Sequence, residues 1–74
     1  MTRLPSLKAG EIIAALEKAG FAKLRQKGSH VRLGHPDGRR VAVPFHPGQD
    51  IGKGFLRKII RDSEMTPEDF LKLL

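Results

Sequence analysis

The 74-residue chain contains no cysteine, tryptophan or tyrosine. Without cysteine it can form no disulfide bond and no thiolate metal site, which fits a reducing compartment. Its apolar runs are too short to span a bilayer, and the first residues lack the apolar stretch of a signal peptide. We therefore expect a cytoplasmic protein with no membrane partner, and a chain of this length to form a single domain over residues 1–74.

Acidic residues are also few, and they are unevenly placed. Eight acidic residues stand against 14 basic ones, which gives a net charge of +6. Between Lys23 and Arg40 there are six basic residues and one acid, and between Lys53 and Arg61 there are four basic residues and no acid. A segregated positive surface concentrates and steers a polyanion, so the pattern indicates a nucleic-acid partner. The alternative is a solvated basic surface without a dedicated partner.

Apolar residues at helical spacing predict two longer helices, one from residue 7 or 8 to residue 19 and one over residues 52–61. A capping pattern at Thr66 marks the start of a short third helix. Gly20 supplies the residue with positive φ that ends the first helix. The apolar side of the second helix, including Phe55, is expected to be buried in the core.

Three strands are expected between the longer helices, over residues 21–27, 29–33 and 40–45. Gly28 forms the turn between the first two, and a Pro-Asp-Gly turn separates the last two. Period-two alternation turns one set of apolar side chains toward the helices: Val31, Leu33, Val41, Val43 and Phe45. The opposite face of the sheet then carries Lys23, Arg25, Lys27, His30, Arg32 and Arg40. The predicted class is α+β, a three-stranded antiparallel sheet with both longer helices on one face.

His30 is the candidate for chemistry on this open, basic face. Histidine is the side chain whose unperturbed pKa, about 6.5, lets it move a proton near neutral pH. RNA carries its own nucleophile, the 2′-hydroxyl, which a histidine can deprotonate as a general base, or it can protonate the 5′-leaving oxygen. Lys27 and the amides near Gly28 and Ser29 could stabilise the charge that grows on phosphorus. The alternative interpretation is a solvent-exposed strand histidine with no catalytic role.

Several sequence elements resemble the HicA-type toxins of bacterial type II toxin–antitoxin systems, which are small mRNA interferases. The markers are Leu16-Glu17-Lys18-Ala19-Gly20-Phe21, Lys27-Gly28-Ser29-His30, Val43-Pro44-Phe45-His46, Gly54-Phe55-Leu56-Arg57-Lys58-Ile59 and Thr66-Pro67-Glu68-Asp69-Phe70. The resemblance covers almost the whole chain. It implies a double-stranded-RNA-binding-like fold, ribosome-independent mRNA cleavage and neutralisation by a HicB-type antitoxin. It also implies that the histidine of the Gly-Ser-His element, His30 in this chain, is catalytic.

The remaining site predictions follow from charge and position. The residues expected to contact RNA are Lys23, Arg25, Lys27, Gly28, Ser29, Arg32, Lys53, Arg57 and Lys58. His46 is a candidate for the second acid–base group, although Pro47 stiffens its loop. His35 is expected to be an exposed strand end. The histidine spacing fits no zinc pattern, so we expect no metal and no cofactor.

Three interpretations of the function therefore stay open at the level of sequence. The first is an endoribonuclease toxin that uses His30 in a metal-free reaction. Attack by the 2′-hydroxyl would then leave a 2′,3′-cyclic phosphate and a 5′-hydroxyl. The second is a non-catalytic RNA-binding module that recognises RNA by its shape. A protein that only binds an acidic protein partner is a third interpretation, which overlaps with the first because an antitoxin must cover the basic face.

Overall fold

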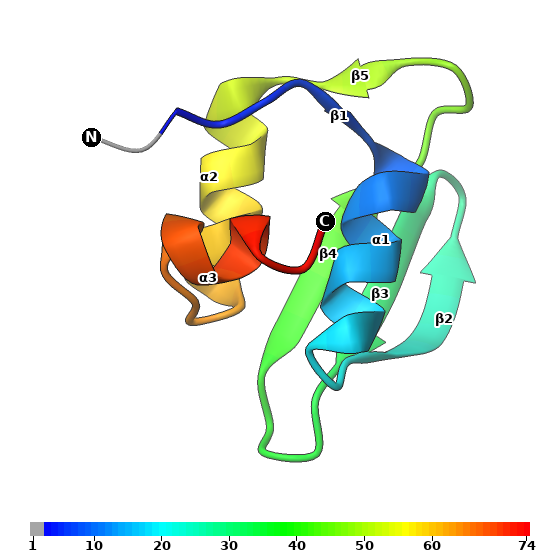
Figure 1. Cartoon of the computed structure of the whole chain (residues 1–74). Helices are drawn as coiled ribbons and strands as arrows, with labels where there is room; N and C mark the ends of the chain where they lie inside the picture. Colours follow the sequence, from blue (N-terminus) through cyan, green and yellow to red (C-terminus); the bar gives the residue numbers. More distant parts are fainter. Residues whose placement is uncertain (1–2) are drawn as a thin grey trace.

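Three antiparallel strands form the central sheet of the protein, whose computed structural model describes residues 3–74 (Figure 1). The elements in chain order are β1 (Leu7–Lys8), α1 (Ala9–Lys18), β2 (Ala22–Lys27), β3 (His30–Gly34), β4 (Arg40–Pro44), β5 (Asp50–Ile51), α2 (Lys53–Asp62) and α3 (Pro67–Leu71). The predicted order of helix, three strands, helix and short helix is confirmed, and the fold class is α+β. Strands β1 and β5 are additional elements.

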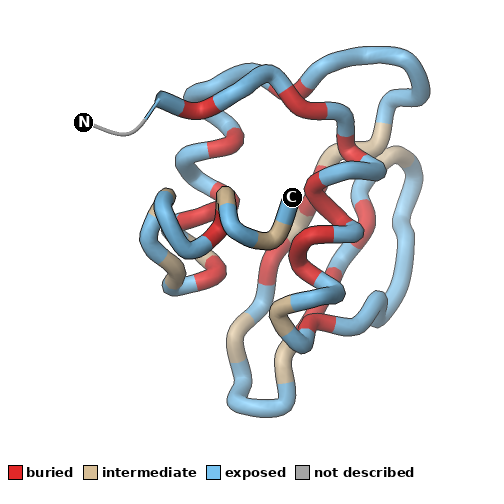
Figure 2. Tube along the Cα trace, in the orientation of Figure 1, coloured by how far each residue is buried: buried red, intermediate tan, exposed pale blue. Residues whose placement is uncertain are grey.

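The core lies between α1, α2 and one face of β3 and β4, as the buried segments in Figure 2 show. The alternation predicted for β3 and β4 is confirmed, since Val31, Leu33, Val41 and Val43 are all buried. Phe45, just past the end of β4, is half-buried and packs against the same core. Burying a side chain such as Leu33 contributes about 1.5–3 kcal/mol, so this face holds the sheet to the helices.

Strand β2 differs from its neighbours because all six of its residues are exposed. It pairs with β3 along one edge, while its other edge has no partner strand in the part of the chain that the structure describes. Neither longer helix reaches over it (Figure 1). The helices therefore cover one face of β3 and β4, and both faces of β2 are open.

A second, two-stranded sheet connects the start of the described chain to the start of α2. Leu7 pairs with Ile51 and Lys8 pairs with Asp50, and the Lys8 ammonium lies 3.3 Å from the Asp50 carboxylate. This pairing shifts the start of α1 to Ala9, one or two residues later than the sequence predicts. A carboxylate oxygen of Glu11 then accepts a hydrogen bond of 3.0 Å from the Lys8 amide, which satisfies a backbone donor at the helix start.

Both longer helices end in the Schellman arrangement. After α1, the amide of Gly20 donates to the Glu17 carbonyl and the amide of Phe21 donates to the Leu16 carbonyl (3.1 and 3.0 Å). Gly20 has a φ of 103°, as the sequence predicts for this position. After α2 the corresponding residue is Glu64, with a φ of 59°. A side chain at positive φ carries a steric penalty that glycine does not.

The third helix begins as the sequence predicts. The hydroxyl oxygen of Thr66 accepts a hydrogen bond of 3.1 Å from the Asp69 amide, and Pro67 occupies the first helical position. Phe70 is then fully buried in the core, with Met65 packed against the same cluster. The cap therefore fixes where the C-terminal helix closes the core.

The turn between β3 and β4 is held by a cluster around Phe21. The ring of His35 meets Phe21 edge to face with centroids 5.2 Å apart, so His35 is packed and the prediction of an exposed strand end is wrong. The Arg39 guanidinium lies 5.1 Å from the Phe21 centroid, pairs with Asp37 at 2.8 Å and donates to the Ser63 carbonyl at 2.6 Å. The Arg39 amide, donating to the Asp37 carboxylate, holds the pKa of that carboxyl below its ordinary 3.8.

Candidate functional site

A two-residue turn places His30 at the start of the central strand. Gly28 and Ser29 connect β2 to β3, and Gly28 has a φ of 59° whereas Ser29 does not lie at positive φ. This is the pattern of a type II′ hairpin turn, for which glycine is favoured at the first position. Lys27 is the cross-strand partner of His30 on one side and Pro44 is its partner on the other. The turn thus fixes His30 beside a cation on the open face.

The side chain of His30 is free to meet a ligand. His30 is exposed, whereas Val31, the next residue, is buried. Within residues 3–74, no hydrogen bond or ion pair involves the His30 imidazole. The predicted exposure of His30 beside basic residues is therefore confirmed.

A β-bulge in β2 changes which of its residues share this face. Lys23 pairs with Leu33 and Arg25 pairs with Arg32, so Leu24 is an extra residue in the strand. Since residues directly opposite in an antiparallel pair point to the same side, Lys23 lies on the side of Leu33. The prediction that Lys23 belongs to the open basic face is wrong, although Lys23 remains exposed. Leu24 takes its place on that face and is 53% exposed.

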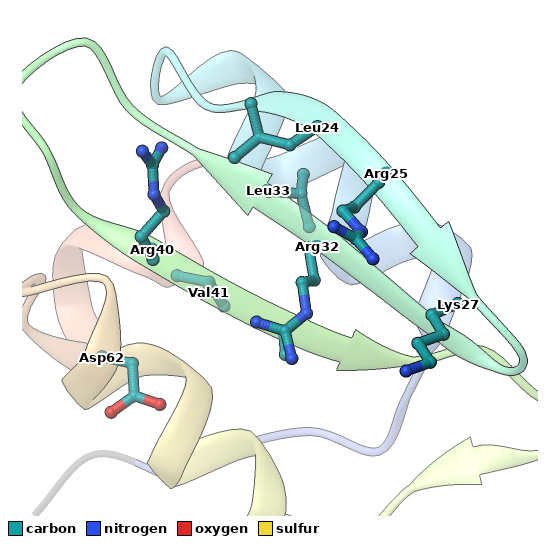
Figure 3. A pocket seen from close by; sticks show the side chains of 9 residues that line it. Leu24, Arg25, Lys27, Arg32, Leu33, Arg40, Val41 and Asp62 are labelled. Atoms are coloured by element: carbon teal, nitrogen blue, oxygen red, sulfur yellow. The ribbon is translucent and has the colours of Figure 1, made fainter.

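Basic side chains surround a hollow of about 580 Å³ on the open face of the sheet, called the basic hollow from here on. Figure 3 shows its cations extending from the strands, and the acidic side chain of Asp62 on the neighbouring helix α2. The charged residues that line it are Arg25, Lys27, Arg32, Arg40 and Asp62. Asp62 is already paired with Lys58, one helical turn earlier, at 2.9 Å. Four cations around one shallow hollow favour binding of a polyanion.

Gly34 is needed for the shape of the basic hollow. A Cβ at this position would overlap the Arg40 guanidinium and lie 2.8 Å from the Leu24 Cδ1. The two side chains therefore meet over the bare glycine, and Leu24 forms an apolar wall beside a cation (Figure 3). Sequence alternation did not indicate Leu24 or Gly34, because only the bulge brings Leu24 to this face.

The basic residues predicted on α2 do not form one surface. Lys58 lies on the side of Asp62 and so near the basic hollow. Arg57 lines a different hollow of about 270 Å³, together with Arg61 and Met65. Lys53 is exposed at the first residue of the helix and, at one turn from Arg57, lies on the side of Arg57. Lys58 is therefore connected to the basic hollow through Asp62, whereas Arg57 lines another hollow and Lys53 lies on the side of Arg57.

His46 lies in a third hollow, of about 300 Å³, between the end of β4 and the start of α2. The residues lining it are Pro44, His46, Gln49, Asp50, Ile51, Gly52 and Phe55. Phe55 is 40% exposed, so the prediction of its burial is wrong. The buried stripe of α2 is centred on Leu56 and Ile60, which leaves Phe55 on its edge.

Within residues 3–74, no group of three histidine, aspartate or glutamate side chains is arranged so that it could hold a metal ion. Over the same residues, none of the helices combines the length and the apolar character that crossing a membrane requires.

The fold and this surface define a small α+β protein with an exposed histidine on a basic sheet. A comparison with protein-family models identifies the family: residues 9–65 match the HicA toxin of bacterial toxin–antitoxin systems, and the chain belongs to this family. It is therefore a toxin of a toxin–antitoxin system, and its family implies an antitoxin partner. A comparison with curated proteins finds no match.

Proposed function

We propose that this toxin is an endoribonuclease that cleaves mRNA, with His30 as its proton-transfer residue and without a metal ion. The observation that carries the proposal is the exposed, unpaired imidazole of His30, with Lys27 as its cross-strand partner and the basic hollow on the same face. The hollow would hold the phosphates of the strand, and the histidine would act on the bond beside them. Membership of a toxin family agrees with a damaging activity of this kind.

The reaction needs few groups because RNA supplies the nucleophile. The 2′-hydroxyl loses its proton and its oxygen bonds to phosphorus, while the bond from phosphorus to the 5′-oxygen breaks and that oxygen gains a proton. His30 transfers one of these two protons, which contributes about 10²–10⁴-fold to the rate. Lys27 stabilises the additional negative charge on the phosphate oxygens in the transition state. The products are a 2′,3′-cyclic phosphate and a 5′-hydroxyl.

A HicB-type antitoxin would inhibit by covering His30 or the basic hollow. The positive side chains around the hollow favour an acidic surface on that partner. His30 is exposed within residues 3–74, so a partner that covers it would block the access of RNA to the imidazole.

The test compares RNA cleavage by the purified toxin, freed of antitoxin, with that of His30→Ala. We expect His30→Ala to lose cleavage but to bind RNA nearly as well as the wild type, since its cations are unchanged. Lys72→Ala, which removes an exposed cation at the end of α3, is the control and should cleave normally. Fragment ends should be 2′,3′-cyclic phosphate and 5′-hydroxyl, and chelator should not change the rate.

Three results would overturn the proposal. If His30→Ala cleaved as fast as the wild type, the histidine would not transfer the proton. If 5′-phosphate ends or loss of activity in chelator were found, the 2′-hydroxyl mechanism would be wrong. If the wild type bound RNA but cleaved none, the protein would be a non-catalytic RNA-binding module.

A further inference from the structure

The hollow that contains Phe55 and His46 lies directly beside His30. Pro44, one of its lining residues, is the cross-strand partner of His30 in the β3–β4 pair. Directly opposite residues in an antiparallel sheet have their side chains on the same face, about 5 Å apart at Cβ. A nucleotide whose phosphate lies at His30 can therefore place a neighbouring base at this hollow.

Phe55 gives the hollow an aromatic surface. All four phenylalanines lie within residues 3–74, and Phe55 is the exposed one: Phe21 and Phe70 are buried and Phe45 is half-buried. The protein has no tyrosine or tryptophan, so within the described residues Phe55 is the one exposed benzene ring, beside the smaller imidazole of His46 in the same hollow. Proteins that bind single-stranded RNA commonly stack unpaired bases on such rings.

Gln49 gives the same hollow an unused polar group. Its backbone amide donates to the His46 carbonyl at 3.0 Å, which closes the turn of this loop. Its side-chain amide makes no hydrogen bond to any other residue in the described range 3–74. A carboxamide offers both a donor and an acceptor, which is the combination that pairs with the edge of a base.

We propose that this hollow is a nucleobase-binding subsite of the ribonuclease, in which Phe55 stacks on the base next to the cleaved bond and Gln49 reads its edge. The inference rests on the proposed RNA cleavage. It assigns His46 to the wall of the subsite, and it makes the loop between β4 and α2 the part of the protein that selects where RNA is cut. A segment of the antitoxin is the other occupant that the test must distinguish.

The first measurement is the affinity for RNA that cannot be cleaved because its 2′-hydroxyls carry methyl groups. Phe55→Ala should weaken binding about tenfold, the loss typical of one base–aromatic stack. Phe55→Leu should weaken binding similarly although it keeps an apolar side chain, and Phe55→Tyr should restore it. Leu74→Ala is the matched control, because Leu74 is also exposed (50%) but lies at the end of the chain. Thermal unfolding of each variant shows whether it is folded.

The second measurement is the distribution of cut sites on a long RNA. Gln49→Ala should cleave with a broader choice of base beside the cut, and its fragments should still end in a 2′,3′-cyclic phosphate and a 5′-hydroxyl. Wild type that cleaves no RNA would refute the proposed function itself. If the wild type cleaved RNA but Phe55→Ala and Gln49→Ala kept its RNA affinity and its cut sites, only the proposed subsite would be refuted. If these two variants bound the antitoxin more weakly but kept the RNA affinity and the cut sites of the wild type, the hollow would be an antitoxin-binding site and the proposed subsite would be wrong.

Discussion

Replacing Gly34 with alanine should change the basic hollow without unfolding the protein. The new methyl group would overlap the Arg40 guanidinium and lie 2.8 Å from the Leu24 Cδ1. Both atoms belong to the ends of flexible side chains, so they can move aside. Gly34 is not at positive φ, and alanine is favoured over glycine within a strand by about 0.5–1 kcal/mol. We therefore expect the free energy of unfolding to change by less than about 1 kcal/mol.

Gly34→Ala should weaken RNA binding measurably, although it changes the free energy of unfolding little. If RNA binds at the hollow as proposed, displacing the Arg40 guanidinium removes one phosphate contact and lowers the slope of log affinity against log salt by about 1. The assay is fluorescence anisotropy with non-cleavable RNA at several salt concentrations, beside urea unfolding of the same variants. Arg40→Ala is the reference variant, because it removes the same guanidinium without adding a methyl group.

The double variant decides whether the glycine acts through Arg40. If it does, Gly34→Ala combined with Arg40→Ala should bind no more weakly than Arg40→Ala alone, since groups in contact are not additive. If the losses of RNA affinity in the two single variants added up fully in the double variant, Gly34 would not act through Arg40. A Gly34→Ala protein that is strongly destabilised but has an unchanged salt slope would also contradict this role of Gly34.

Three further predictions concern stability. Arg39→Met should lower the free energy of unfolding by about 2 kcal/mol, because it removes the hydrogen bond to Ser63 and the cation–π contact with Phe21. Urea unfolding measures this loss, and an unchanged free energy would contradict the stabilising role of the Phe21 cluster. Glu64→Gly should raise the free energy of unfolding by about 0.5–1 kcal/mol by relieving the positive φ, whereas Glu64→Ala should give no gain. Asp37→Asn should melt below the wild type at pH 7. Because the folded pKa of Asp37 is lowered, this difference should vanish as the pH falls below 3.8 and through the folded pKa; a difference independent of pH would show that the charge is not responsible.

The sequence predicted those features that depend on a long or strongly patterned signal. Alternation over β3 and β4 was sufficient to identify Val31, Leu33, Val41 and Val43 as core residues and to place His30 on the open face. Gly20 and Thr66 were also predicted correctly, because a helix end requires particular residue types at fixed positions.

The features that the sequence missed depend on one extra residue or on very short pairings. The bulge at Leu24 shifts the register of β2, and nothing in its alternation fixes the residue at which the shift occurs. Strands of two residues, such as β1 and β5, are too short for any periodicity. Phe55 lies at the edge of an amphipathic stripe, where hydrophobicity alone does not decide between core and surface.

The exposure of the whole of β2 has a consequence for the energetics of the basic face. Detaching this strand from β3 uncovers few core side chains, because none of its own residues is buried. Its opening therefore costs much less than global unfolding, and its amide hydrogens should exchange faster than those of β4. Arg25 and Lys27 belong to this loosely held strand. Because a ligand that contacts both strands binds the form in which β2 is paired with β3, its binding should slow amide exchange in β2 more than in β4.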